Sequence, residues 1–165
     1  MLKQAQLKFF VSTGEYFKQR LQGYPYAQEF VSSRLLVVCT DGADKIAGVC
    51  GIRSLFNIAV LYISKDYRGY GIGTRLLSKA VKAAEKRPPN FVSATIAAEN
   101  DVILHILLKL RFRQVLFLEK SRQRLMVSSS TFMGKLAGAV FRVIGLAVPN
   151  YVLSFIHSLF YIRTV

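Results

Sequence analysis

The residues best suited to chemistry form a glycine-rich turn, Arg68-Gly69-Tyr70-Gly71-Ile72-Gly73, between an apolar run and a helix-like run. Glycine lets the backbone turn tightly and approach a ligand closely. The start of the following helix presents unpaired N–H groups and the positive end of its dipole, which attract anions. Arg68 adds a fixed positive charge. The turn therefore predicts a phosphate or diphosphate site, and the alternative is an ordinary strand-to-helix turn that uses glycine for steric reasons.

Other kinds of site find less support in the sequence. The turn does not end in Gly-Lys-Ser/Thr, which excludes a P-loop, and its glycine spacing does not fit a Rossmann fingerprint. His105 and His157 are far apart in the sequence, so we expect no metal site. We expect His105 to lie at the rim of the core or to have its hydrogen bonds satisfied within the protein. Cys39 and Cys50 are too few for a disulfide scaffold; we expect core positions and a reducing, cytoplasmic compartment.

The elements that must position the turn alternate between strand-like and helix-like patterns. An Asp-Gly turn separates two apolar runs and predicts a hairpin. Asn100 has the character of a helix N-cap. The expected strands are 34–40, 45–53, 57–64, 91–98, 115–119 and 124–128, and the expected helices are 16–21, 27–31, 74–86 and 100–110. The helix over 74–86 has one apolar stripe, formed by Leu76, Leu77, Ala80, Val81 and Ala84. This order predicts a mixed α/β or α+β fold around a central sheet.

Two segments resemble the GNAT superfamily of N-acetyltransferases. Residues 61–77 resemble its acetyl-CoA motif, a strand followed by Arg/Gln-x-x-Gly-x-Gly/Ala and a helix with Leu-Leu in its first turn. Residues 100–112 resemble its Asn-x-x-Ala-x-x-Leu-Tyr-x-Lys-Leu-Gly-Phe segment. The resemblance covers residues 10–129 and implies a mostly antiparallel central sheet flanked by helices, with acetyl-CoA as the cofactor.

The resemblance also implies how the cofactor binds. Backbone amides of the turn would hold the pyrophosphate, and the pantetheine arm would pair like an extra strand with the end of the preceding strand. Asn100 matches an asparagine that contacts pantetheine, and a purely capping role is the alternative. The implied cofactor-binding residues are Leu61, Tyr62, Ile63, Arg68, Gly69, Tyr70, Gly71, Ile72, Gly73, Thr74 and Asn100.

The chain departs from the family where catalysis is concerned. The family often has a tyrosine that protonates the leaving thiolate, and Leu107 stands there. No Asp or Glu occurs in 57–64, where many members carry a base for the amine. Tyr62 and Tyr67 lie near the presumed acetyl end and are candidate proton donors, with aromatic packing as the alternative. No catalytic residue is therefore assigned beyond these two candidates.

Charge and apolar character are concentrated at the end of the chain. The 165 residues carry a net charge of +14, and 52% of them are hydrophobic. Beyond Glu119 the sequence contains no acidic side chain. Basic charge indicates nucleic acid, an acidic substrate or anionic lipid as a partner. Nucleic acid is disfavoured, because basic and aromatic residues do not alternate as they do on base-stacking surfaces.

Residues 130–165 form an apolar extension to the expected acetyltransferase domain of residues 1–129. Its segments 131–148 and 151–162 predict two mostly apolar helices, the first with a narrow polar face of Lys135, Gly138, Arg142 and Gly145. Three alternatives remain: lipid contact at an anionic membrane surface, a single membrane span over 143–162, or packing on the domain or in a homodimer.

The sequence thus predicts an acetyl-CoA-dependent N-acetyltransferase that moves an acetyl group to a primary amine by direct attack. The acceptor amine is not identified by any motif. A catalytically silent acyl-CoA-binding module, held at a membrane or in a dimer, is the alternative. We expect a cytoplasmic protein, associated with a membrane if the extension contacts lipid.

Overall fold

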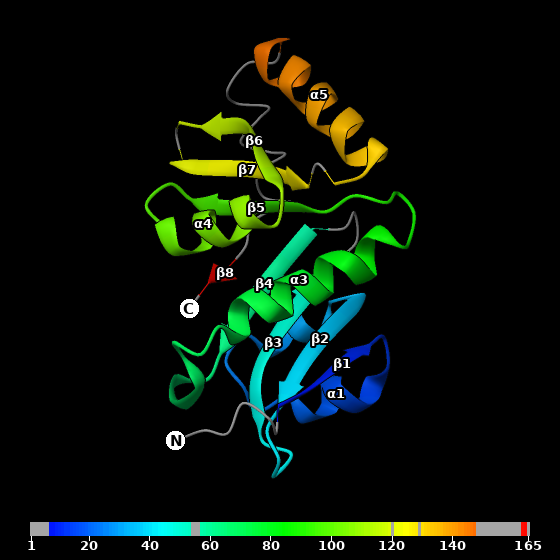
Figure 1. Ribbon diagram of the computed structural model, residues 1–165, viewed down its shortest axis with the longest axis vertical. Coiled ribbons are helices and arrows are strands. Elements are labelled where there is room, and N and C mark those ends of the chain that lie inside the picture. The colour runs from blue at the N-terminus through cyan, green and yellow to red at the C-terminus, as the bar shows by residue number, and fades with distance from the viewer. Residues whose placement is uncertain (1–6, 54–56, 120, 129, 148–162, 165) are drawn as a thin grey trace.

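The computed structural model describes residues 7–53, 57–119, 121–128, 130–147 and 163–164. A twisted sheet runs through the molecule, with strands in the order β1-β2-β3-β4-β5-β7-β6 (Figure 1). The strands are β1 (Lys8–Ser12), β2 (Leu35–Thr40), β3 (Ile46–Ile52), β4 (Asn57–Ile63), β5 (Ser93–Ala97), β6 (Phe112–Leu118) and β7 (Gln123–Ser128), and the two-residue β8 (Arg163–Thr164) pairs with β4. All neighbours along this order are antiparallel except β4 and β5. The predicted mixed, mostly antiparallel sheet is confirmed.

The hairpin of β2 and β3 confirms the expected turn at residues 41–44. Asp41 organises the turn, because its Oδ1 accepts hydrogen bonds from the amides of Ala43 and Lys45 at 2.9 Å each. The register pairs Cys39 with Gly48 rather than near Ile46 as the turn position alone predicts, because a bulge follows Cys39. Strand β1 was not expected; it pairs with β2 at the edge of the sheet.

Helix α3 (Ile72–Glu85) covers one face of β2, β3 and β4 (Figure 1). Its predicted apolar stripe is buried in the main core: Leu76, Leu77, Ala80, Val81 and Ala84. The helix begins two residues before the predicted Thr74, because the glycine turn already has helical geometry at Ile72. Helices α1 (Glu15–Arg20) and α2 (Ala27–Val31) cover the other face through Phe17 and Phe30. Both faces of these strands are therefore buried.

The sheet opens between β4 and β5. These parallel strands pair only at Asn57 with Ser93 and at Ile58 with Ala94. At the first of these pairs, the Ser93 hydroxyl donates to Asn57 Oδ1 at 3.4 Å. After Ile58, the remaining five residues of β4 diverge from β5. The chain after β5 leads into helix α4 (Asp101–Lys109). A wedge thus opens between two strands of one sheet, and β8 pairs with the β4 side of it at Val60 and Leu61.

Helix α5 (Phe132–Ala147) confirms the first predicted helix of the extension, while the predicted helix over 151–162 lies outside the described residues. The helix packs on β6 and β7, where Ala137 and Phe141 contact the cluster of Val115, Leu125 and Val127. Among the described residues, no helix combines the length and apolar character needed to cross a membrane. The proposed single span over 143–162 lies mostly outside those residues.

Candidate functional site

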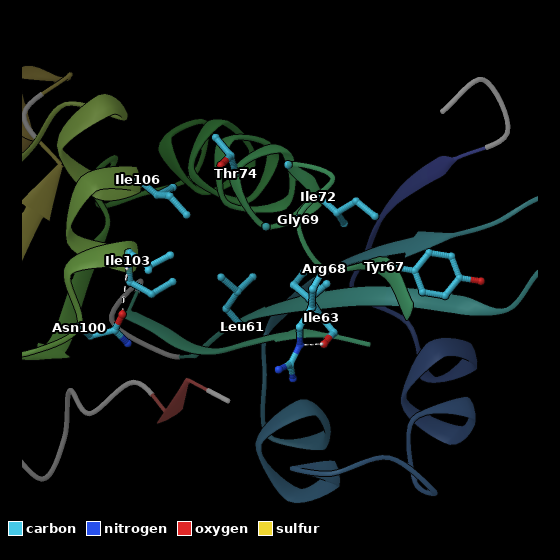
Figure 2. A pocket seen from close by; sticks show the side chains of 13 residues that line it. Leu61, Ile63, Tyr67, Arg68, Gly69, Ile72, Thr74, Asn100, Ile103 and Ile106 are labelled. Atoms are coloured by element: carbon cyan, nitrogen blue, oxygen red, sulfur yellow. Dashed lines mark hydrogen bonds between the residues drawn. The ribbon is translucent and has the colours of Figure 1, made fainter. Parts of the chain in front are cut away.

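A cavity of about 570 Å³ lies where the end of β4, the glycine turn and the start of α4 meet (Figure 2). It brings together most of the residues singled out in the sequence, although they come from three separate segments. Its walls are formed by Leu61, Ile63, Tyr67, Arg68, Gly69, Gly71, Ile72, Gly73, Thr74, Asn100, Val102, Ile103 and Ile106. The cavity is charged and rich in backbone amides at the turn, and apolar along β4 and α4.

The glycine turn needs glycine at two positions for conformational reasons. Gly69 has φ +80° and Gly71 has φ +72°, a left-handed region that L side chains rarely adopt. No heavy atom lies within 4 Å of where a Cβ would stand on either residue, so the space above the turn is open. Helix α3 starts at Gly71 without a side-chain cap. The first amides of α3 are thus presented to the cavity, as an anion site requires.

Arg68 places its charge next to the end of β4. Its Nε donates a hydrogen bond to the carbonyl oxygen of Ile63 at 3.2 Å (Figure 2). This contact ties the turn to the strand and leaves the remaining guanidinium N–H groups exposed for an anionic ligand. The structure therefore joins the two predicted parts of the site, the turn and the strand end, through one side chain.

The Tyr67 ring lies against the cavity, but its hydroxyl points away from it (Figure 2). The hydroxyl donates to Asp41 Oδ2 at 2.5 Å. That hydrogen bond, with burial and the charge of Asp41, raises the pKa of Tyr67 to about 12, and the same bond lowers the pKa of Asp41. Because the hydroxyl donates its hydrogen bond to a carboxylate outside the cavity, this arrangement favours the packing alternative for Tyr67.

Tyr62 faces the opposite side of β4 from its neighbours Leu61 and Ile63, which line the cavity. Its ring packs edge to face on Tyr24, with centroids 6.2 Å apart. Tyr70, at the tip of the turn, is 44% exposed. Neither Tyr62 nor Tyr70 is among the residues that line the cavity, although both were predicted to bind cofactor.

Helix α4 supplies a wall that sequence reasoning missed. Asn100 caps the helix as expected, and its Oδ1 accepts a hydrogen bond from the Ile103 amide at 3.2 Å. Val102, Ile103 and Ile106 then line the cavity. The sequence signal that could have predicted these three apolar residues was their position in the first two helical turns after the cap. Leu107, at the family's tyrosine position, is fully buried in the main core.

The edge of β4 that faces the wedge carries a strand that was not expected. The backbone of β8 pairs in parallel with β4, Arg163 opposite Val60 and Thr164 opposite Leu61. The other edge of β4 is occupied by β3. Strand β8 therefore occupies the β5-facing edge of β4 and overlaps, at Leu61, the stretch that was predicted to pair with a pantetheine arm.

The remaining candidate groups lie outside the cavity. Cys39 and Cys50 are buried free thiols, as expected, and burial raises their pKa values to about 11 and about 12. His105 is exposed, and its Nδ1 lies 2.8 Å from the carbonyl oxygen of Asp101. Within the described part of the chain, no three His, Cys, Asp or Glu side chains are grouped so that they could hold a metal ion.

Part of the chain is similar in sequence to a known protein. A curated N-acetyltransferase of Methanocaldococcus jannaschii, itself uncharacterized, is 32% identical over 62 residues, which are 38% of this chain and 27% of that relative. The match thus spans about a quarter of the relative's length.

Solved structures share the fold at low sequence identity. Arabidopsis thaliana Naa50, solved with a bisubstrate CoA analogue, has a TM-score of 0.55 at 16% identity, over 76% of this chain and 99% of that one. The NatC complex bound to Gag peptide and CoA contains a chain with a TM-score of 0.57 at 14% identity, over the same shares. The IAA acetyltransferase of Bacillus cereus gives 0.56 at 17% identity, over 74% and 98%.

The family itself is decided by the sequence profile of the acetyltransferase (GNAT) domain. That profile matches residues 3–102, more than half of the chain, and the matched stretch includes β4, the glycine turn and α3. The mixed sheet with its wedge and the turn with its exposed amides agree with this match. The chain therefore belongs to the GNAT family of acetyltransferases.

Proposed function

We propose that the protein is an acetyl-CoA-dependent N-acetyltransferase that transfers the acetyl group to a primary amine by direct attack. The observation that carries the proposal is the single cavity that joins the glycine turn to the open end of β4. A diphosphate needs the amides of the glycine turn, and an extended pantetheine arm needs the open end of β4. The structures of Naa50 with a CoA analogue and of NatC with CoA, which share this fold, support the choice of ligand.

The turn would hold the diphosphate of CoA. The backbone amides from Arg68 to Thr74 supply donors at the positive end of α3, and the Arg68 guanidinium adds a charge-assisted contact. The open space over Gly69 and Gly71 lets phosphate oxygens approach the backbone closely.

The wedge would hold the pantetheine arm against Leu61, Tyr62 and Ile63 of β4. Leu61 and Ile63 contribute apolar side chains to the cavity, while Tyr62 can contribute only its backbone on this side. Val102, Ile103 and Ile106 face them from α4. The described residues of β8 pair with β4 as far as Leu61, so arm and strand would compete at that residue.

The cavity offers positioning rather than acid–base groups. Acetyl-CoA supplies an activated thioester when bound, and a neutral amine can attack it without a strong base if both are held in line. Leu107 is apolar and buried, and the Tyr67 hydroxyl donates its hydrogen bond to Asp41 outside the cavity, so neither is placed to protonate the thiolate. We therefore expect a rate that rises with pH as the acceptor amine loses its proton.

The same lack of acid–base groups is the observation that favours a second function, a catalytically silent module that binds acyl-CoA. Such a module would use the turn and the wedge in the same way. It would need no access for an amine and no proton transfer.

Two measurements on the full chain separate the functions. Calorimetry with CoA tests binding, and thiol release from acetyl-CoA with a panel of amines tests turnover. Arg68→Ala should weaken CoA binding about tenfold or more, whereas Arg34→Ala, which removes an exposed cation just before β2, should leave it unchanged. Binding without turnover would establish the silent module, and no binding would refute both functions.

A further inference from the structure

Helix α5 has an inward face built for close contact with the sheet. Gly134 and Gly138 are buried there, and Ala137 and Phe141 are half-buried against β6 and β7. A Cβ on Gly138 would stand 3.4 Å from Val115 Cγ1, so the helix lies close to the strand. The orientation of α5 is therefore fixed, and so is the set of residues that it turns outward.

The outward face of α5 is apolar. The exposed fractions are 78% for Phe132, 47% for Leu136, 48% for Val140 and 64% for Val143, and the spacing of these residues forms one helical stripe. Met133, 38% exposed, extends the stripe sideways. Single exposed apolar residues are common, but a continuous stripe of them marks a contact surface.

Cations flank this stripe on one side. Lys135 and Arg142 of α5, with Arg113 of β6, line a shallow pocket of about 80 Å³ between the helix and the strand. All three side chains are exposed. The ion pairs found among residues 7–53, 57–119, 121–128 and 130–147 involve Lys18, Arg20 and Lys45 instead. The three pocket cations are thus placed to meet an external anion.

An apolar stripe flanked by cations is the surface pattern of a helix that lies in the plane of a membrane. We propose that the outward face of α5, with Arg113, Lys135 and Arg142, docks on an anionic lipid surface. Phe132, Leu136, Val140 and Val143 would enter the boundary between headgroups and acyl chains, while the cations contact lipid phosphates.

Charge and apolar character together favour lipid over a second copy of the chain or nucleic acid as the partner of this face. A two-fold dimer that packs α5 antiparallel on its copy through this face would bring two copies of the Arg113, Lys135 and Arg142 cluster together, and like charges would oppose it. Nucleic acid would suit the cations, but it offers no apolar surface for Phe132 and Val143. An anionic bilayer satisfies both halves of the pattern.

Flotation with vesicles tests the proposal on the full chain. The protein should float with phosphatidylcholine mixed with phosphatidylglycerol and much less with phosphatidylcholine alone, and added salt should reduce the difference. Because each cation near an anionic surface contributes roughly a fivefold factor in partitioning, Lys135→Gln/Arg142→Gln should lower binding about 25-fold. Lys8→Gln/Lys82→Gln removes the same charge from exposed sites on β1 and α3 and should have little effect.

A second pair of variants tests the apolar stripe. Leu136→Gln/Val140→Gln should also strongly reduce flotation, whereas Val31→Gln/Leu108→Gln, which changes exposed residues of α2 and α4, should not. Unchanged thermal midpoints confirm that all these variants fold. Equal binding to both vesicle types, or α5 variants that float like the parent, would overturn the proposal. So would a dimer in light scattering that Leu136→Gln/Val140→Gln converts to monomers.

Discussion

The starts of helices α3 and α5 both depend on glycine, but for opposite reasons. At α3, Gly71 has φ +72° and nothing stands within 4 Å of where its Cβ would be. At α5, the Thr131 hydroxyl accepts a hydrogen bond from the Gly134 amide at 3.0 Å. A Cβ on Gly134 would clash with the carbonyl oxygen of Ser128. One helix start is therefore open to a ligand, and the other is capped and packed against its own chain.

The difference shows that a glycine near a helix start indicates a ligand site only when the space around it is empty. Gly71 and Gly69 allow a backbone conformation and leave their amides accessible. Gly134 allows close packing, and its amide is already satisfied by a side chain. A substitution at each of these glycines tests the role assigned to it.

The largest effect should come from Gly134→Ala. The added methyl group meets backbone rather than a flexible side chain, so α5 must shift away from β7. We expect the free energy of unfolding to fall by about 3 kcal/mol, the upper end for overpacking. Urea denaturation measures it, and Gly23→Ala, where nothing lies within 4 Å, is the matched control. Equal stabilities would show that the start of α5 is not closely packed.

Gly71→Asp should instead act on ligand binding. Aspartate tolerates the left-handed conformation better than most residues, so the fold should survive, but its carboxylate would oppose a diphosphate. We expect CoA affinity to fall about a hundredfold, and only about tenfold for the neutral Gly71→Asn. Calorimetry measures both. Similar losses in the two variants would mean that charge at this helix start does not matter.

A third helix start, that of α4, tests whether one residue can serve both purposes. Asn100→Ala removes the cap on Ile103 and should cost about 1 kcal/mol of stability. Asn100→Asp keeps a capping oxygen and should keep the stability, while CoA affinity falls a few-fold if the side chain also contacts the ligand. Chemical denaturation and calorimetry on both variants separate the roles. Full affinity in both would leave Asn100 as a cap alone.

Local patterns were enough to predict the elements around the site. The turn residues at 41–44, the apolar stripe of α3 and the cap at Asn100 each depend on neighbours in sequence, and each is present as predicted. The convergence of the turn, β4 and α4 followed only from the family resemblance. The sequence pattern of either strand alone does not indicate that β4 and β5 diverge after Ile58.

The rest depended on contacts between distant segments. Nothing near Tyr67 in sequence indicates that its hydroxyl reaches Asp41, 26 residues earlier, and so turns away from the cavity. The cationic pocket joins Arg113 of β6 to Lys135 and Arg142 of α5, which only the packing of the helix on the sheet brings together. The predicted polar face of this helix also included Gly138, which is buried against Val115.

The smallest effect should come from Gly138→Ala, one turn beyond Gly134 on the same face of α5. Its Cβ would stand 3.4 Å from Val115 Cγ1, a side-chain atom that can move by a few tenths of an ångström. Alanine also favours the helix by about 1 kcal/mol over glycine, which offsets the tighter contact. We expect a change in unfolding free energy within about 0.5 kcal/mol, and vesicle binding like the parent because the methyl group faces the sheet. A loss as large as that of Gly134→Ala would show that the whole inward face of α5, and not only its first turn, is packed against unyielding neighbours.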